Sequence, residues 1–396
     1  MEENSYRCEA CGGTMVFDPI SQKLKCPNCD SEIEIIHDEA RVVEHTLTID
    51  AMRQQKATEK TTKTMECTGC GAKIEIGANE TAAKCPYCDA TYVLAGEQES
   101  TLIPDAVLPF KVDKNELGGI FQSWMKGKWL APGDLKNLYQ RDSFQGIYIP
   151  FWTFDANGDA NFTAMGGKRR RVKDENGEEK TVTDWYPTSG HVHKFFDDIP
   201  AAASDRYRKG LFRGLEPFAF DEMKSYSPDY FSGHMSENYS ISLEDGHKDA
   251  INRMTGELKS MAEKQVCANY DCVKDVHMRP VFKDETYKYV MVPVYSTAYQ
   301  YKNKTYTVLI NGHSGRVQGE YPKSPVKIIM LILLAALVLG AIWFFGGRKS
   351  NETDAAMAYE NSVYAKTIEH TAAYISDSQA NVADIDVDGL LDTYQI

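Results

Sequence analysis

The chain has 396 residues, too many for one core of usual size, and its 42% hydrophobic and 26% charged residues are typical of folded domains. A net charge of -13 argues against nucleic acid as the main partner, because phosphate neutralisation needs clustered Lys and Arg. The acidic start Met1-Glu2-Glu3 is followed by no apolar run, so we expect no cleavable secretory signal and a cytoplasmic N-terminal region.

Eight of the ten cysteines form two modules with the spacing Cys-x2-Cys-x14-Cys-x2-Cys, related by a shift of 59 residues. This spacing is close to that of a zinc ribbon, in which two turns at hairpin tips present four thiolates to one Zn²⁺. We predict two structural Zn²⁺ sites, with an iron–sulfur centre as the alternative. The predicted ligands are Cys8, Cys11, Cys26 and Cys29 for the first zinc and Cys67, Cys70, Cys85 and Cys88 for the second.

The charge around these modules bears on their role. Four thiolates leave no open coordination position, so neither zinc is expected to activate water. Residues 1–100 hold ten Lys or Arg against eighteen Asp or Glu, and a thiolate-bound zinc adds further negative charge. We expect modules that dock proteins or are purely structural, with nucleic-acid binding as the alternative reading.

Composition changes along the chain predict a multi-domain protein. The polar stretch between the two cysteine modules reads as a linker with a short helix around residues 49–56. The predicted order is a β zinc ribbon at 1–36, the linker at 37–64, a second β zinc ribbon at 65–96, a central domain at 101–325, a transmembrane helix at 326–346 and an acidic tail at 347–396.

The central region alternates aromatic-rich strand patterns with two helical patterns, which predicts an α+β domain with a mainly antiparallel sheet. Residues 289–310 end in the turn Asn311-Gly312 and read as a β-meander. The predicted strands are 146–152, 289–295 and 304–310, and the predicted helices are 115–126, continuing at 132–139, and 249–264.

Residues 328–345 contain no charge, and at about 1.5 Å per residue a helix of this length spans most of a ~30 Å hydrocarbon core. Lys327 and Arg348 flank it and can snorkel at the two interfaces. Because the thiolates need the reducing cytoplasm, we predict a single-pass cell-membrane protein with a cytoplasmic N-terminus and an extracytoplasmic tail.

Two smaller groups in the central region have alternative readings. Cys267 and Cys272 have no His or Cys beside them and read as ordinary buried thiols. His191 and His193 would share one side of a strand, which permits a metal or catalytic role, but no third ligand is visible in the sequence and an exposed pair is expected.

The basic run 168–173 is followed by an acidic segment with Asn176-Gly177 between them, which predicts a hairpin with opposite charges facing each other. The alternative is an anionic partner such as phospholipid headgroups.

The acidic tail contains a pattern similar to a calcium loop, Asp-x-Asp-x-Asp-Gly-x-x-Asp. Position 12 of the loop is Gln395 instead of Glu, so a solvated tail is the default and weak Ca²⁺ binding is the alternative. The candidate Ca²⁺ ligands are Asp384, Asp386, Asp388 and Asp392.

Several motifs together carry a family resemblance: the duplicated cysteine modules, the strand Tyr148-Ile149-Pro150-Phe151-Trp152, Pro293-Val294-Tyr295, Asn311-Gly312 with Gly315-Arg316-Val317, and Tyr321-Pro322-Lys323 before the apolar segment. Over residues 1–346 the chain resembles the bacterial membrane-anchored TFIIB-type zinc-ribbon proteins, often labelled primosomal or helicase-like. The chain has no Gly-x4-Gly-Lys-Ser/Thr loop, so ATP-driven unwinding is not expected.

The resemblance implies a setting, because some relatives are encoded with phage shock protein A and an SPFH-type membrane protein. Since no catalytic constellation is visible in the sequence, we expect a non-enzymatic membrane adaptor that recruits cytoplasmic or membrane scaffold proteins in an envelope-stress response. The alternative is a membrane-tethered zinc-ribbon protein of replication or transcription that binds nucleic acid.

Overall fold

The computed structural model describes residues 6–35, 42–54, 63–66, 73–76, 80–84, 91–93, 102–133, 144–173, 177–207, 209–302 and 304–346. The chain divides into two compact units, Met1–Pro322 and Lys323–Ile396, and each is described by itself. The first unit contains a curled, mainly antiparallel sheet, as the sequence predicts, and the second contains one apolar helix.

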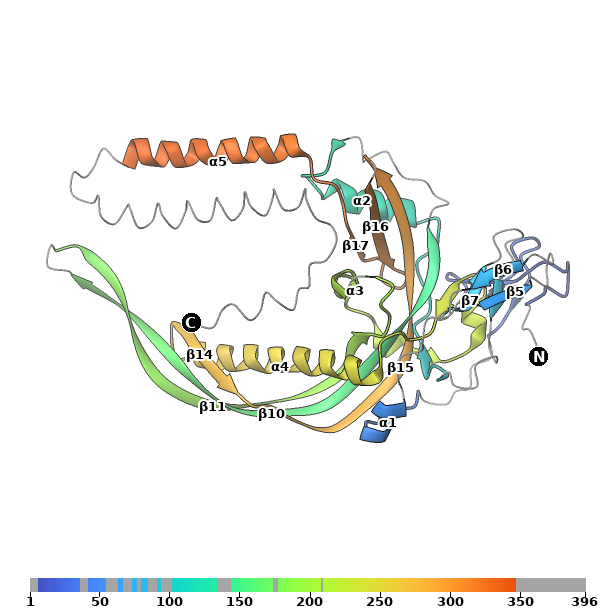
Figure 1. The fold of residues 1–396 in the computed structure, drawn as a ribbon, viewed down its shortest axis with the longest axis horizontal. Helices are drawn as coiled ribbons and strands as arrows, with labels where there is room; N and C mark the ends of the chain where they lie inside the picture. Colours follow the sequence, from blue (N-terminus) through green and yellow to red (C-terminus); the bar gives the residue numbers. More distant parts are fainter. Residues whose placement is uncertain are drawn as a thin grey trace. The chain divides into compact units, whose positions relative to one another are not determined.

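Long strands form the centre of the sheet. β10 (Gln145–Lys173) and β11 (Glu179–Ala202) pair antiparallel in one curved hairpin, and β15 (Val281–Tyr301) pairs antiparallel with the other edge of β10 (Figure 1). Both pairings shift register at a bulge beside Asp155, and bulges bend a strand and increase its twist. The predicted strands 146–152 and 289–295 are parts of β10 and β15.

The tip of the long hairpin carries the predicted charge pairing. The register aligns Lys173 with Glu179, and the guanidinium Nε of Arg170 lies 2.5 Å from a carboxylate oxygen of Asp184. Gly177 has φ +81°, the left-handed conformation that an Asn-Gly hairpin turn requires. The predicted hairpin is therefore confirmed.

Helix α4 (Leu243–Cys267) lies in the concave face of the curved hairpin (Figure 1). Ser242 caps its N-terminus, because the Ser242 hydroxyl accepts a hydrogen bond from the backbone N–H of Asp245 at 3.2 Å. Its buried residues recur every four positions and give it one apolar face toward the sheet. They include Ala250, Met254, Leu258, Ala262 and Val266.

Aromatic rings fill the core between the sheet and the segment before α4. Trp152 is fully buried, and its ring centroid lies 5.0 Å from that of Tyr289 and 5.1 Å from that of Tyr239. Its indole Nε1 donates a hydrogen bond to the carbonyl oxygen of Ile241 at 3.1 Å. The buried tryptophan thus keeps its only polar group satisfied.

Shorter elements complete the central region. β16 (Lys304–Asn311) pairs with β15 and with β17 (Val317–Gly319), which is the predicted meander, and α2 (Leu117–Lys126) is the first predicted helix. Of the predicted continuation at 132–139, residues 134–139 lie outside the described residues. The other elements are β9 (Ala106–Val107), α3 (Lys209–Leu215), η3 (Phe220–Glu222), β12 (Lys224–Ser225), η4 (Pro228–Phe231), β13 (Met235–Glu237) and β14 (Cys272–Met278).

The described part of the segment predicted as a linker packs on the sheet. β4 (His45–Thr46) pairs with β15, and α1 (Ile49–Gln54) is the short helix expected near residues 49–56. Glu44 reaches the buried Lys288 at 3.2 Å, and Asp198 pairs with the same ammonium at 2.8 Å. Burial alone would lower the pKa of Lys288, but these carboxylates and Asp155 raise it above its ordinary value. This ion cluster fastens the segment to the sheet.

In the second unit, α5 (Pro325–Gly346) is the predicted apolar helix. Its window Pro325–Ile342 is long and apolar enough to cross a membrane, and none of that window is buried. Within the described residues it is the one helix with this property. Such a surface of Leu, Ile and Val is unusual for a helix facing water, which is weak support for membrane anchoring.

Candidate metal centre

Short strands position the first set of predicted ligands. β1 (Val16–Asp18), β2 (Lys23–Lys25) and β3 (Glu32–Ile33) form a small antiparallel sheet, preceded by a bridge between Arg7 and Thr14. One cysteine pair lies in the turn closed by that bridge, and the other lies in the turn between β2 and β3. We call residues 6–35 the first cysteine module.

The two turns have the same backbone design. The N–H of Cys8 donates to the carbonyl of Gly13 at 2.7 Å, and the N–H of Cys26 donates to that of Ser31 at 2.9 Å. The residue that follows the second cysteine of each turn has a left-handed backbone conformation, with φ +73° at Gly12 and +59° at Asp30. These turns direct all four thiols to one point.

The four sulfur atoms of Cys8, Cys11, Cys26 and Cys29 lie within 4.8 Å of one another. The Sγ atoms of Cys8 and Cys29 are 3.5 Å apart, as are those of Cys11 and Cys26, well beyond a disulfide bond of about 2.05 Å. Cys8 and Cys26 are buried, whereas Cys11 and Cys29 are exposed. The cluster is thus a set of free thiols at the edge of the module.

The thiols have divergent acidities. The hydroxyl and backbone N–H of Ser31 lower the pKa of Cys29 to about 6. The N–H of Gly13 lowers the pKa of Cys11, but hydrogen bonds with the sulfurs of Cys29 and Cys26 outweigh it and raise that pKa to about 12. A hydrogen bond between two thiols therefore lowers the pKa of Cys29 and raises that of Cys11, whereas a bound cation would favour the ionised form of all four.

A tetrahedral metal ion fits this donor set. Four closely spaced thiols are the ligand set of structural zinc and, in other proteins, of iron–sulfur centres. Within the ranges that the structure describes, no other group of three or more Cys, His, Asp or Glu ligand atoms is this compact. The four predicted ligands of the first module are therefore close enough together to bind one metal ion.

The first cysteine module docks on the central sheet. The N–H of Phe17 donates to the carbonyl of Ser232 at 2.9 Å, and the hydroxyl of Ser232 donates to the carbonyl of Met15 at 2.7 Å. The Phe17 ring packs edge-on against Tyr230 at 5.2 Å between centroids. Apolar residues of the module, with Cys8 and Cys26, belong to the same buried cluster as the central aromatic residues. We call residues 228–237 the docking segment.

Two residues of the docking segment are specific to this packing. Gly233 has φ +85°, and a Cβ there would lie 2.9 Å from Cβ of Val16 in the module. His234 is buried and stacks on Phe110 at 4.2 Å between ring centroids, and burial lowers its pKa from 6.5 to about 3. His234 is thus neutral, and no local sequence pattern singled it out.

The described strands of the second module repeat the register of the first. Glu66 pairs with Lys73 as Arg7 pairs with Thr14, and Lys84 pairs with Thr91 as Lys25 pairs with Glu32. Pairing of Ser236 with Ala82 joins this module to the docking segment. The strands are β5 (Lys63–Glu66), β6 (Lys73–Ile76), β7 (Glu80–Lys84) and β8 (Thr91–Val93). The predicted ligands Cys67, Cys70, Cys85 and Cys88 lie outside the described residues.

The candidate calcium ligands Asp384, Asp386, Asp388 and Asp392 also lie outside the described residues. The prediction that the two remaining cysteines are buried is wrong, because Cys267 is exposed and Cys272 is half-buried. The reason is helical geometry: the buried face of α4 runs through Ala262 and Val266, and the next residue turns toward solvent.

His191 and His193 share one exposed face of β11, as predicted, and β10 supplies a third polar group there. Oδ1 of Asp159 lies 2.9 Å from Nε2 of His191, and Oδ2 lies 3.7 Å from Nδ1 of His193. The hydrogen bond with His191 lowers the pKa of Asp159. These residues form an exposed ionic cluster, and their ligand atoms do not converge as the four sulfurs do.

Comparison with known proteins adds one relative. No family model matches the sequence, and no solved structure matches it. The chain is 27% identical over 343 residues to a Bacillus subtilis (strain 168) protein named "Uncharacterized protein YdjG", covering 86% of this chain and 93% of that protein. The similarity therefore spans nearly the full length of both chains.

Proposed function

We propose that this protein is a non-enzymatic membrane adaptor in which zinc-bound cysteine modules and the central sheet dock partner proteins beside the bilayer. The observation that carries the proposal is the four-thiol cluster fixed to the central sheet through the docking segment. Zinc held by four thiolates has no open position for a substrate, so its role is to hold a surface in shape.

The surface of the first cysteine module favours a basic protein partner. Residues 6–35 contain three Lys or Arg and five Asp or Glu, and four thiolates around Zn²⁺ add two negative charges. Glu9, Asp30, Glu32 and Glu34 are exposed. Such a surface repels phosphates, so nucleic acid is the less suitable partner.

The proposal includes a second zinc held by Cys67, Cys70, Cys85 and Cys88, because the strands that flank them repeat the pairing of the first module. It also includes a single membrane crossing by α5 with the thiols on the cytoplasmic side. The family resemblance suggests that the partners are membrane-stress scaffold proteins.

A crosslinked pull-down of the full-length protein from nuclease-treated native membranes tests the adaptor. The variant Cys11→Ser/Cys29→Ser removes the two exposed ligands and keeps the buried Cys8 and Cys26, and Cys267→Ser removes an exposed thiol on α4. We expect defined scaffold proteins, such as an SPFH-type protein, to be captured by the wild type and by Cys267→Ser and lost from the double variant.

Elemental analysis of the same preparations gives the metal content. We expect two zinc ions per wild-type chain and one in the double variant. Recovery of polymerase or primosome components, or capture that persists after the zinc is lost, would contradict the adaptor proposal.

A further inference from the structure

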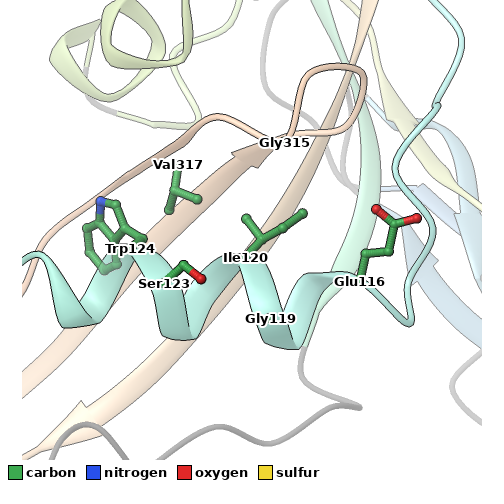
Figure 2. A pocket seen from close by; sticks show the side chains of 7 residues that line it. All are labelled: Glu116, Gly119, Ile120, Ser123, Trp124, Gly315 and Val317. Atoms are coloured by element: carbon green, nitrogen blue, oxygen red, sulfur yellow. The ribbon is translucent and has the colours of Figure 1, made fainter.

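A shallow apolar groove, wide open to solvent, lies between α2 and the turn that leads into β17, with a volume of about 640 Å³ (Figure 2). Figure 2 shows Trp124 toward one end of the groove and Glu116 toward the other, with Ile120 and Val317 between them. Its lining is Glu116, Gly119, Ile120, Ser123, Trp124, Gly315 and Val317. The groove therefore has one acidic end and an aliphatic and aromatic remainder.

The sequence of α2 explains why the groove is apolar. Leu117, Phe121 and Met125 recur every four residues and are buried in the core. Ile120 and Trp124 form a second stripe beside the first, and both are only half-buried. Both side chains also contact the buried core cluster, so only their exposed parts are available to a further apolar contact.

The tryptophan end of the groove combines aromatic rings with a cation. The ring of Trp124 meets that of Tyr321 edge-on, with centroids 6.1 Å apart. The ammonium of Lys128 lies 5.0 Å from the Trp124 ring centroid and 5.5 Å from that of Tyr321. Trp129, just beyond, is 58% exposed. Trp, Tyr and Lys together are the side chains enriched where a protein meets the membrane–water interface.

Chain connectivity limits how far Tyr321, at this end of the groove, can lie from the start of α5. Tyr321 precedes the first residue of α5, Pro325, by four residues, which span at most about 14 Å when fully extended. This limit holds for any orientation of the helix. If α5 crosses a membrane, as proposed above, this limit keeps Tyr321 within reach of the headgroup region.

We propose that the groove binds a phospholipid of the membrane that α5 crosses. An acyl chain lies against Ile120, Val317 and Trp124, and the headgroup phosphate lies beside Lys128, away from the carboxylate of Glu116. This inference rests on the proposed membrane anchoring, so its test reports on both separately.

The test uses the full-length protein in phosphatidylcholine–phosphatidylglycerol vesicles with and without brominated acyl chains, which quench tryptophan fluorescence on contact. The chain has five tryptophans, of which Trp343 lies in α5. Quenching of the wild type that falls in Trp343→Phe reports insertion of α5. The groove is then tested in the double variant Trp343→Phe/Trp129→Phe. Adding Trp124→Phe to it should remove most of the remaining quenching. Adding Trp185→Phe, the control, should leave that quenching unchanged.

A second pair of variants blocks the groove. Gly119 lines the groove, and a Cβ there would meet no atom within 4 Å, so Gly119→Leu adds an apolar side chain at the groove. Gly256 on α4 is equally open at Cβ and serves as the control. We expect Gly119→Leu, but not Gly256→Leu, to reduce the quenching of Trp124 at least two-fold.

Two results would overturn parts of the inference. Quenching of Trp343 with none from Trp124 would refute the lipid site and leave the anchor intact. If Trp124 were then also shielded from aqueous iodide, a second copy of the chain would cover the groove. No quenching of the wild type would refute the membrane anchor itself.

Discussion

The first cysteine module and the central sheet share one buried cluster, yet different interactions hold each in shape. The three strands of the module have three residues or fewer, whereas β10, β11 and β15 have 29, 24 and 21. The buried apolar residues of the module, apart from its cysteines, are Met15, Phe17, Leu24 and Ile35. Burial of these few side chains cannot offset the conformational entropy that the module loses when it becomes ordered. We infer that the folded module depends on a bound metal and on contact with the docking segment.

This contrast indicates where each kind of damage should appear. Substitution of a metal-binding cysteine should unfold the module and leave the central sheet folded. Substitution of a buried aromatic residue of the central sheet should destabilise both the sheet and the module, because the module packs on that sheet. A substitution in the docking segment should weaken the contact between the module and the central sheet. The following predictions test these three cases in decreasing order of expected effect.

The largest effect is expected for Cys26→Ser, because Cys26 is fully buried and its sulfur is one of the four metal ligands. Structural zinc in small modules contributes roughly 10–16 kcal/mol of apparent binding free energy at neutral pH, so loss of a ligand should release the metal and unfold residues 6–35. Elemental analysis should show one zinc fewer per chain, and limited proteolysis should cut this segment first. Unchanged zinc content would refute the site, and Cys267→Ser is the control.

Trp152→Ala tests the central sheet. Removing a fully buried indole that packs against Tyr239 and Tyr289 should lower the free energy of unfolding by about 3–5 kcal/mol. Urea unfolding followed by circular dichroism measures this loss, and the zinc content of the folded variant should stay unchanged. Zinc loss at urea concentrations where the sheet remains folded would contradict the proposed dependence of the module on the sheet.

Gly233→Ala tests the docking segment. A Cβ at φ +85° and 2.9 Å from Val16 Cβ combines backbone strain with a clash, for which we expect a loss of about 2–4 kcal/mol. Gly177→Ala is a matched control, because Gly177 has a similar φ of +81° but open space around it. Amide exchange in β1 should accelerate in Gly233→Ala only. Equal effects of both variants would mean that backbone strain, not docking, sets the cost.

Local sequence signals predicted those features that are encoded over short distances. The cysteine spacing indicated the four-thiol cluster, Asn176-Gly177 indicated the hairpin, and the uncharged run indicated α5. In each case the physical cause lies within about twenty residues: ligand geometry, turn conformation or continuous hydrophobicity.

Interactions between distant residues were not predictable in this way. Ser232 and Met15 are 217 residues apart in sequence, and Lys288 and Glu44 are 244 apart. Asp159 is an intermediate case. The register that aligns Lys173 with Glu179 also aligns Asp159 with His193, so extending the predicted hairpin along the chain would have found the missing carboxylate.

The smallest expected effect is a pH dependence at the docking segment. Because burial lowers the pKa of His234 from 6.5 to about 3, the unfolded state binds a proton that the folded state does not. The stability contributed by the neutral histidine is complete above pH 6.5 and is lost as pH falls toward 3, by up to about 1.4 kcal/mol per pH unit.

Comparing the wild type with His234→Asn isolates this contribution, because acid-sensitive carboxylates are common to both proteins. The asparagine loses the stacking on Phe110 and should be less stable at pH 7, but its urea midpoint should fall less steeply between pH 6.5 and 5. Since His234 lies next to Gly233, protonation of His234 at low pH should also weaken the docking contact and speed amide exchange in β1 of the wild type. Parallel pH curves for the two proteins would show that His234 binds protons equally in both states, and the module would then be less tightly sealed against the sheet than its packing indicates.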